Sequence, residues 1–323
     1  MKTSEKIIEY LKIKKQVSTK ELVDYLGLSR MAVFNQLNNL LADGRIVKTG
    51  RPPKVFYALA EKKVSLIKEN IINQKASQDI DENYLIITPS GERKEGVNGF
   101  AYWCEKNNLP LEKTAMEYGA TLEKYHAFKK DGLIDGIAKF RSTFPQPALD
   151  RAFYMDFYSI ERFGKTKLGQ LLLYAKQSQD RRLMKELVTN VQTVVDGLVK
   201  KYEIDAVGFI PPTVKREVQF MRELERGLNL AVKKISIVKI KSDIVVPQKT
   251  LSKPSDRIEN ARKTIVVDEK GVYNRILLID DAVGSGATLN ETAAQIKEKG
   301  IAKEVIGFSI TGSFKGFDVI SEV

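Results

Sequence analysis

Two adjacent acids form the part of this chain whose chemistry is easiest to interpret. Asp280 and Asp281 follow the apolar run Ile276–Ile279, which has the length and composition of a strand buried on both faces of a parallel sheet. Paired carboxylates beside such a strand are costly, because each charge disfavours the ionisation of the other. Carboxylates bind sugar hydroxyls, either directly or through a divalent cation such as Mg²⁺. The pair therefore indicates a site for a hydroxylated ligand.

The small residues that come next predict an anion site. Gly284-Ser285-Gly286-Ala287-Thr288 leads into a segment with helical spacing that stops at Gly300. A strand, a small-residue turn and a helix in this order leave free backbone N–H groups at a helix N-terminus, where phosphate binds. The spacing fits neither a Walker A loop nor the dinucleotide fingerprint, and a turn with a purely structural role is the alternative. The acids and the turn together predict a phosphorylated sugar as the ligand.

The elements that must position this site alternate along the second half of the chain. Helical segments are expected over Leu168–Ala175 and up to about Lys201, and strand-like runs over Ala206–Ile210 and 236–246. Strands that alternate with helices favour a parallel sheet. We therefore predict an α/β fold, a mostly parallel sheet with helices on both faces, over residues 151–323.

This half resembles the type I phosphoribosyltransferases, and within them the ComF family, over roughly residues 155–315. Three features carry the resemblance: the acid-pair loop, the run Arg226-Gly227-Leu228-Asn229, which is expected to open the helix after the first strand, and QKTLSKPSDRIENARKTI at 248–265. Two features depart from the ComF pattern. That family usually begins with a Cys-rich zinc element, which a chain with Cys104 alone cannot form, and Gly284 stands where Thr is usual.

The resemblance implies that the site binds phosphoribosyl pyrophosphate (PRPP) with Mg²⁺. Asp280 and Asp281 would hold the ribose hydroxyls and the metal, and the loop after them the 5′-phosphate. The implied PRPP residues are Asp280, Asp281, Ala282, Val283, Gly284, Ser285, Gly286, Ala287 and Thr288. The implied pyrophosphate loop is Pro211, Pro212, Thr213, Val214 and Lys215. A lid over the pyrophosphate would contain Lys249, Arg257, Asn260 and Arg262, although that polar run could also be a solvated surface loop.

The first sixty residues resemble a winged helix-turn-helix domain. They contain a short amphipathic helix, a second helix with Thr19 as the expected N-cap, the turn at Gly27, a third helix that Ser29 would cap, and two strand-like runs. On this pattern the third helix enters the major groove and the wing reaches phosphates. The expected DNA-binding residues are Ser29, Arg30, Met31, Asn35, Gln36, Lys48, Arg51 and Lys54. A winged helix used only for protein contacts is the alternative.

Composition is consistent with these domains. The chain of 323 residues carries a net charge of +12, and residues 1–60 hold eleven Lys and Arg against five Asp and Glu, which favours a polyanionic partner. No signal peptide or long apolar span appears, so we expect a cytoplasmic protein without a membrane segment. We predict domains at 1–60 and 151–323. Residues 61–150, a mostly helical linker or hood with helices over 98–140, show no recognisable chemistry.

Three functions remain open at this point. The first is a DNA-binding regulator, expected as a homodimer on double-stranded DNA, that senses PRPP or a nucleotide. The second is an active phosphoribosyltransferase that joins a base or related nucleophile to ribose 5-phosphate and releases pyrophosphate. The third is a scaffold component of a DNA-uptake or defence complex.

Overall fold

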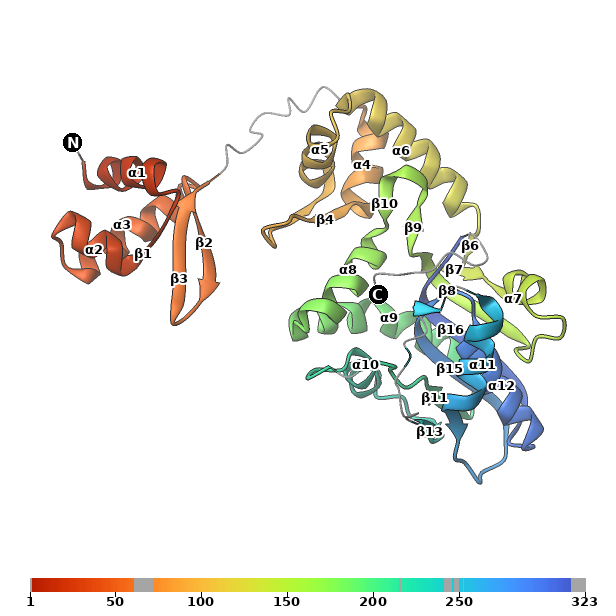
Figure 1. Ribbon diagram of the computed structural model, residues 1–323. Helices are drawn as coiled ribbons and strands as arrows, with labels where there is room; N and C mark the ends of the chain where they lie inside the picture. Colours follow the sequence, from red (N-terminus) through yellow and green to blue (C-terminus); the bar gives the residue numbers. More distant parts are fainter. Residues whose placement is uncertain are drawn as a thin grey trace. The chain divides into compact units, whose positions relative to one another are not determined.

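The computed structural model (Figure 1) describes residues 2–60, 72–214, 216–240, 246, 250–251 and 253–314. The chain forms two compact units, Met1–Glu69 and Asn70–Val323. Of the predicted linker, residues 61–71 lie outside the described part.

The first unit contains three helices and a three-stranded antiparallel sheet in the order β1-β3-β2. The elements are α1 (Thr3–Lys14), β1 (Gln16–Ser18), α2 (Thr19–Leu26), α3 (Arg30–Ala42), β2 (Ile46–Arg51) and β3 (Lys54–Leu59). One apolar side chain or more from each of these elements enters a common core, which contains Ile7, Leu11, Val17, Leu22, Val33, Leu37, Leu40, Ile46 and Tyr57. The β2–β3 hairpin is the predicted wing.

Helix caps set the geometry between α2 and α3. Ser18, and not Thr19 as predicted, caps α2: its Oγ accepts from the N–H of Glu21, and the Glu21 carboxylate accepts from the N–H of Ser18. This reciprocal capping box satisfies two N–H groups at once, which favours Ser18 over its neighbour. Gly27 ends α2 in the left-handed conformation (φ 63°), and Ser29 caps α3 as predicted.

The second unit is built on a seven-stranded sheet in the order β12-β11-β15-β16-β8-β7-β6. Its first five strands are parallel, and β7 and β6 add antiparallel at one edge. The strands are β6 (Lys129–Lys130), β7 (Leu133–Asp135), β8 (Arg151–Phe157), β11 (Ala206–Phe209), β12 (Lys233–Lys234), β15 (Tyr273–Val283) and β16 (Ala302–Gly312). This confirms the mostly parallel sheet. The prediction of helix throughout 98–140 was wrong for β6 and β7, which are too short to show a period of two in the sequence.

Helices cover both faces of this sheet (Figure 1). On one face lie α8 (Lys167–Ser178), α9 (Arg181–Lys201) and α10 (Phe220–Leu228), and on the other α7 (Ile137–Thr143), α11 (Pro254–Thr264) and α12 (Ala287–Glu298). Successive side chains of β15 point to opposite faces of the sheet, so this strand contributes to both cores. Leu277 and Ile279 pack toward α8–α10, and Ile276 and Leu278 pack toward α11–α12. All four are fully buried, which contributes roughly 1.5–3 kcal/mol for each side chain.

The run Arg226–Asn229 closes α10 and does not open a helix as predicted. Asn229 follows the last helical residue in the left-handed conformation (φ 41°), which asparagine tolerates better than most residues. A Cβ on Gly227 would lie 2.6 Å from Cγ1 of Val188 on α9, so glycine lets α9 and α10 approach closely.

A helical hood packs beside the sheet. It consists of α4 (Gln74–Asn83), α5 (Gly96–Lys106), α6 (Leu111–His126) and the hairpin of β4 (Leu85–Ile87) and β5 (Arg93–Glu95). Its aromatic core, which includes Phe100 and Tyr118, packs against Phe163 in the short segment of β9 (Ser159–Ile160), η1 (Glu161–Phe163) and β10 (Gly164–Lys165). A separate antiparallel pair joins β13 (Ile237–Lys239) to β14 (Ile265–Val267).

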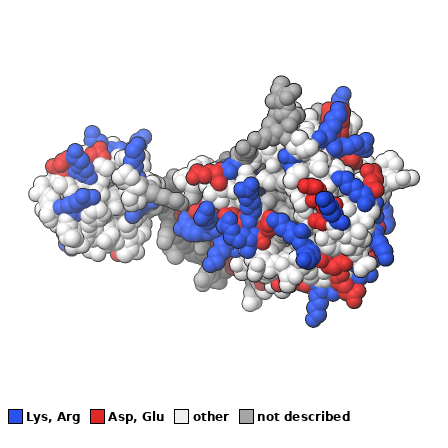
Figure 2. Space-filling view, turned by 90° about the horizontal axis from the view of Figure 1, so that it is seen from below, with Lys and Arg blue, Asp and Glu red and all other residues white. Residues whose placement is uncertain are grey.

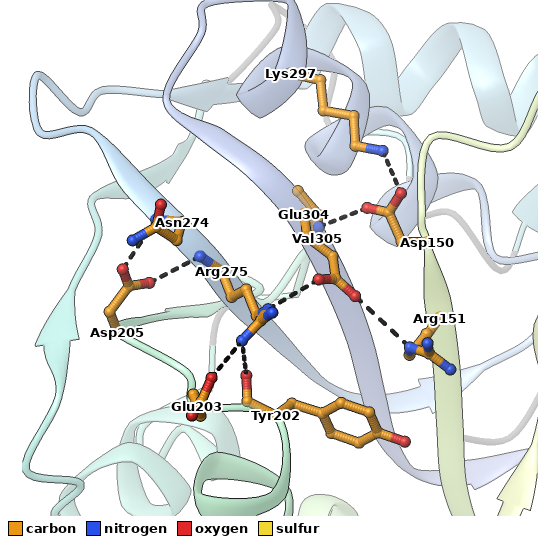
Figure 3. A network of polar contacts seen from close by, with 10 residues as sticks. All are labelled: Asp150, Arg151, Tyr202, Glu203, Asp205, Asn274, Arg275, Lys297, Glu304 and Val305. Atoms are coloured by element: carbon orange, nitrogen blue, oxygen red, sulfur yellow. Dashed lines mark hydrogen bonds and ion pairs between the residues drawn. The ribbon is translucent and has the colours of Figure 1, made fainter.

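Polar contacts fix the amino-terminal ends of the parallel strands (Figure 3). The Asp205 carboxylate accepts from the N–H groups of Asn274 and Arg275, both at 2.9 Å, and Arg275 Nε donates to Glu304 at 2.9 Å. Asp150 likewise accepts from the N–H of Val305 at 2.7 Å. These contacts set strand register at the end of the sheet opposite to the carboxyl ends, where α/β proteins place ligands. No helix among the described residues is both long and apolar enough to cross a membrane.

Candidate functional site

The two acids lie in the carboxyl-terminal part of β15, as predicted, and the strand continues beyond them to Val283. Side chains alternate along a strand, so Asp280 and Asp281 leave it toward opposite faces. The carboxylate of Asp281 points to the α8 face, where its Oδ2 lies 2.6 Å from Nζ of Lys176. The side chains of Asp281 and Lys176 are 17% and 11% exposed, so both are largely buried. Their ion pair compensates the negative charge of Asp281.

No cation among the described residues contacts Asp280 in this way. Desolvation, and then the negative charge of Asp281, raise the pKa of Asp280 to about 7, and the more distant charges of Lys176 and Lys239 only partly oppose this. Its Oδ1 accepts a hydrogen bond from the N–H of Asp281 at 2.8 Å. A half-buried carboxyl whose pKa is raised by burial and by a neighbouring carboxylate gains from a nearby cation or hydroxyl donor.

The small-residue turn presents bare backbone N–H groups. Gly286 precedes α12 with a φ of 79°, and a Cβ there would lie 2.6 Å from the ring of Phe140, so both conformation and space require glycine. No side chain caps α12. No acceptor among the described residues pairs with the N–H groups of Gly284, Ser285, Gly286 or Thr288. With the positive end of the helix dipole, this turn is suited to an anion.

These features line one cavity of about 180 Å³. It brings together residues 280–288, the segment 211–214 that was predicted to be the pyrophosphate loop, and Arg257 of the predicted lid. Lys215 lies outside the described residues. Gln219 stabilises the 211–214 segment, because its Nε2 donates a hydrogen bond to the carbonyl of Val214 at 3.0 Å.

Three cations among the described residues line this cavity, and two of them were not predicted from the sequence. Arg257 is buried, its Nε donates to the carbonyl of Leu251 at 2.7 Å, and desolvation lowers its pKa from the ordinary arginine value. Lys176 comes from α8, and Arg216 follows the 211–214 segment. Arg216 forms no ion pair with a described residue. Lys176 carried a usable signal, because it continues the buried stripe of α8 one turn after Leu172, where a lysine requires a counter-charge.

Two other predicted lid residues, Asn260 and Arg262, are described and do not line this cavity. Arg262 points to α12, where its Nε lies 2.9 Å from the Glu291 carboxylate, and Asn260 lines a neighbouring cavity. Lys249 lies outside the described residues. Of the three lid residues that the structure describes, only Arg257 therefore contributes to the wall.

The carboxylate oxygens of this site are suited to a metal ion whose other ligands come from water and from the substrate. No group of three His, Cys, Asp or Glu side chains that could hold a metal occurs in the described part of the chain. The carboxylates of Asp280 and Asp281 alone fit Mg²⁺, a cation that usually keeps several waters and binds through one or two carboxylates together with substrate phosphates.

The predicted DNA-contacting residues share the surface of the first unit. Ser29, Arg30, Met31 and Asn35 are exposed at the start of α3, with Met31 at 71%, whereas Gln36 is half-buried. Lys48 and Lys54 are exposed on the wing, and the Arg51 side chain lies outside the described part. Figure 2 shows basic side chains spread over the visible face of this unit.

Comparison with known proteins identifies the first unit. No curated protein sequence matches the chain. Several solved structures are similar to part of it, among them two phosphoribosyltransferases. A hypoxanthine phosphoribosyltransferase from Staphylococcus aureus has 13% identity, with 40% of this chain and 64% of that chain covered and a TM-score of 0.25. An adenine phosphoribosyltransferase from Leishmania tarentolae has 12% identity, with 55% and 96% covered and a TM-score of 0.27. Residues 4–50 match the DeoR-like helix-turn-helix domain, so the chain carries a helix-turn-helix domain of this type at its amino end.

Proposed function

We propose that this chain is a cytoplasmic, DNA-binding regulator whose larger unit binds PRPP or a nucleotide, as a ComF-like phosphoribosyltransferase domain would. One observation carries the proposal: a single cavity combines a carboxylate pair, a turn of free N–H groups and three cations. In a phosphorylated sugar such as PRPP, the hydroxyls would bind the carboxylate pair, the 5′-phosphate would bind the N–H groups of the turn, and the pyrophosphate would bind the three cations.

Each part of the cavity has a role in this proposal. Asp280 and Asp281 accept hydrogen bonds from ribose hydroxyls, while the amides of residues 284–288 bind the 5′-phosphate. Arg216 and Arg257 neutralise a pyrophosphate beside Pro211–Val214. Asp280 and Asp281 would hold Mg²⁺ when PRPP is bound, and the cation would supply charge neutralisation at the pyrophosphate.

The composition of the cavity wall favours a sensor over a transferase. A transferase also needs a pocket for the acceptor base, for which the hood was the candidate. No hood residue from 72 to 126 is among the described residues that line the cavity. The described residues that line this cavity therefore explain binding of the activated sugar, and none of them comes from the hood that was expected to bind an acceptor base.

The helix-turn-helix domain provides the output. Arg30 and Asn35 would contact base edges from α3, and Lys48 and Lys54 phosphates from the wing, in a homodimer that reads two half-sites. The effector would change DNA affinity only by binding one conformation of the protein more tightly than the other.

Calorimetry of the full chain with PRPP and Mg²⁺ tests the pocket. We expect saturable binding, about tenfold or more weaker in Asp281→Asn because charge-assisted hydrogen bonds are removed. Asp268→Asn, which makes the same change on an exposed turn, is the matched control. Absence of heat with PRPP and with nucleoside monophosphates would overturn the ligand assignment.

DNA fragments enriched on the immobilised chain from a random library test the output. Titration of a labelled fragment with and without PRPP should give different affinities. Identical curves would remove the sensing role, and pyrophosphate release in the presence of a base would replace it with a transferase.

A further inference from the structure

A second cavity, of about 870 Å³, lies on the other side of the Pro211–Val214 segment. Ile210, Gln219 and Met221 also line both cavities, so a thin wall of shared residues divides them. The rest of the lining comes from β11, β12, β13, α10 and α11 and from the residues beside these elements. Its apolar members include Phe209, Ile235, Ile237 and Ile240. Cavities of this size accommodate ligands as large as nucleotides.

Positive charge in this cavity exceeds negative charge. Lys234 pairs with Glu225, which leaves Arg222 and Lys239 without a carboxylate in contact among the described residues. Lys239 is half-buried, and its Nζ donates to Thr213 Oγ1 at 2.9 Å. A half-buried ammonium whose only contact among the described residues is a hydroxyl is energetically costly, and an anion would stabilise it.

We infer that this second cavity binds an aromatic anion of nucleotide size, with its ring among Phe209, Ile235 and Ile237 and its acidic group on Lys239. The apolar side chains suit a planar ring, and the excess of cations selects against neutral or basic molecules. The inference goes beyond the proposed function, because it assigns a second ligand to a site that PRPP does not need.

The two sites would be coupled through one hydrogen bond. Thr213 belongs to the wall of both cavities, and Lys239 contacts it from the second. An acidic group that takes the ammonium of Lys239 would release Thr213 and shift the segment that faces the first cavity. The second ligand would then modulate the affinity of the first site.

Fluorescence titration of the full chain with 8-anilinonaphthalene-1-sulfonate, an aromatic anion, tests the inference. We expect saturable binding of one dye per chain. Ile237→Trp should weaken it by placing a larger side chain where the ring would lie, and Lys239→Met should weaken it about tenfold by removing the cation. Val238→Trp is the matched control, because Val238 is exposed on the opposite side of the same strand and does not line the cavity.

Cooperative thermal unfolding of each variant verifies that it is folded, and Lys239→Met keeps the cavity intact if Ile237→Trp does not fold. Lack of saturable dye binding, or equal binding by wild type and Lys239→Met, would overturn the inference. Asp281→Asn separates the two sites: it should weaken PRPP and leave the dye affinity unchanged. The proposed PRPP site can thus fail while the second cavity is confirmed, and the reverse.

Discussion

Lys176 and Asp281 form an ion pair at 2.6 Å between residues that are 105 positions apart in the sequence. The contact joins α8 to the carboxyl-terminal part of β15, and both side chains are largely withdrawn from water. Lys176 therefore orients the Asp281 carboxylate, whereas desolvation and the charge of Asp281 raise the pKa of the neighbouring Asp280. The two adjacent carboxyls thus lie in different electrostatic environments.

Removing Lys176 should destabilise the larger unit. Lys176→Met leaves the Asp281 carboxylate in a site with little water, which we expect to lower the free energy of unfolding by about 1–3 kcal/mol after allowance for partial exposure. Urea unfolding measures the change. Lys263→Met, which breaks an exposed pair with Glu259, is the control and should have no measurable effect. An equal loss in both variants would show that the buried position of Lys176 is unimportant.

The raised pKa of Asp280 predicts a specific pH dependence of stability. Between about pH 4 and pH 7 the native state keeps a proton that the unfolded chain releases, so the free energy of unfolding falls as pH rises and levels off above 7. Asp280→Asn removes this term and should be more stable than wild type by about 1–3 kcal/mol at pH 8, with little difference near pH 4. Urea unfolding from pH 4 to 8 measures both proteins. If their difference stays constant with pH, Asp280 has an ordinary pKa.

The sequence predicted the local parts of the site well. Strand, turn and helix around Ile276–Thr288 follow from an apolar run, small residues and a helical period, all of which lie within one short segment. The helix-turn-helix was predictable for the same reason, and the match over residues 4–50 confirms it. The end of the strand was harder to predict, because charged residues near the carboxyl end of a strand can still form backbone hydrogen bonds with the neighbouring strand.

Residues that reach the site from distant segments were not predictable. Lys176 and Lys239 meet the acid region only because α8 and β13 pack at the carboxyl ends of the strands, and no spacing in the sequence encodes that approach. Arg262 shows the opposite failure. The motif at 248–265 predicted that it belongs to a lid, but its side chain leaves α11 on the side that faces α12 and pairs with Glu291. The sequence thus specified the elements, and packing decided which side chains converge.

Gly286 should tolerate no side chain. Gly286→Ala places a Cβ against Phe140 in a left-handed backbone conformation, so strain and overpacking together should cost about 2–4 kcal/mol in the free energy of unfolding. Gly300→Ala has a similar φ of 67° with no atom within 4 Å, so it isolates the conformational term of about 1–2 kcal/mol. Thermal or urea unfolding of both variants measures the difference. Equal losses would mean that Phe140 moves aside at no cost.

The start of α3 should determine DNA affinity without contributing to stability. Arg30 and Asn35 are exposed and lie outside the core of the first unit, so Arg30→Ala and Asn35→Ala should leave the unfolding transition unchanged. Each should weaken binding to an enriched DNA fragment by about 1–3 kcal/mol if it contacts a base edge. Fluorescence anisotropy measures the affinity.

Lys12→Ala is the control for Arg30→Ala, since it removes one exposed positive charge from α1, on a helix outside the turn between α2 and α3. Weaker binding confined to the α3 variants means that specific contacts dominate over net charge. Equal weakening by Lys12→Ala and Arg30→Ala would instead mean that the basic surface attracts DNA without α3 reading it, because removal of any single charge from a nonspecific site has a similar effect on affinity. The dependence of affinity on salt concentration distinguishes these cases further. A side chain that binds a phosphate reduces the slope by about one when it is removed, whereas removal of a side chain that binds a base lowers affinity for the enriched fragment and relaxes sequence preference.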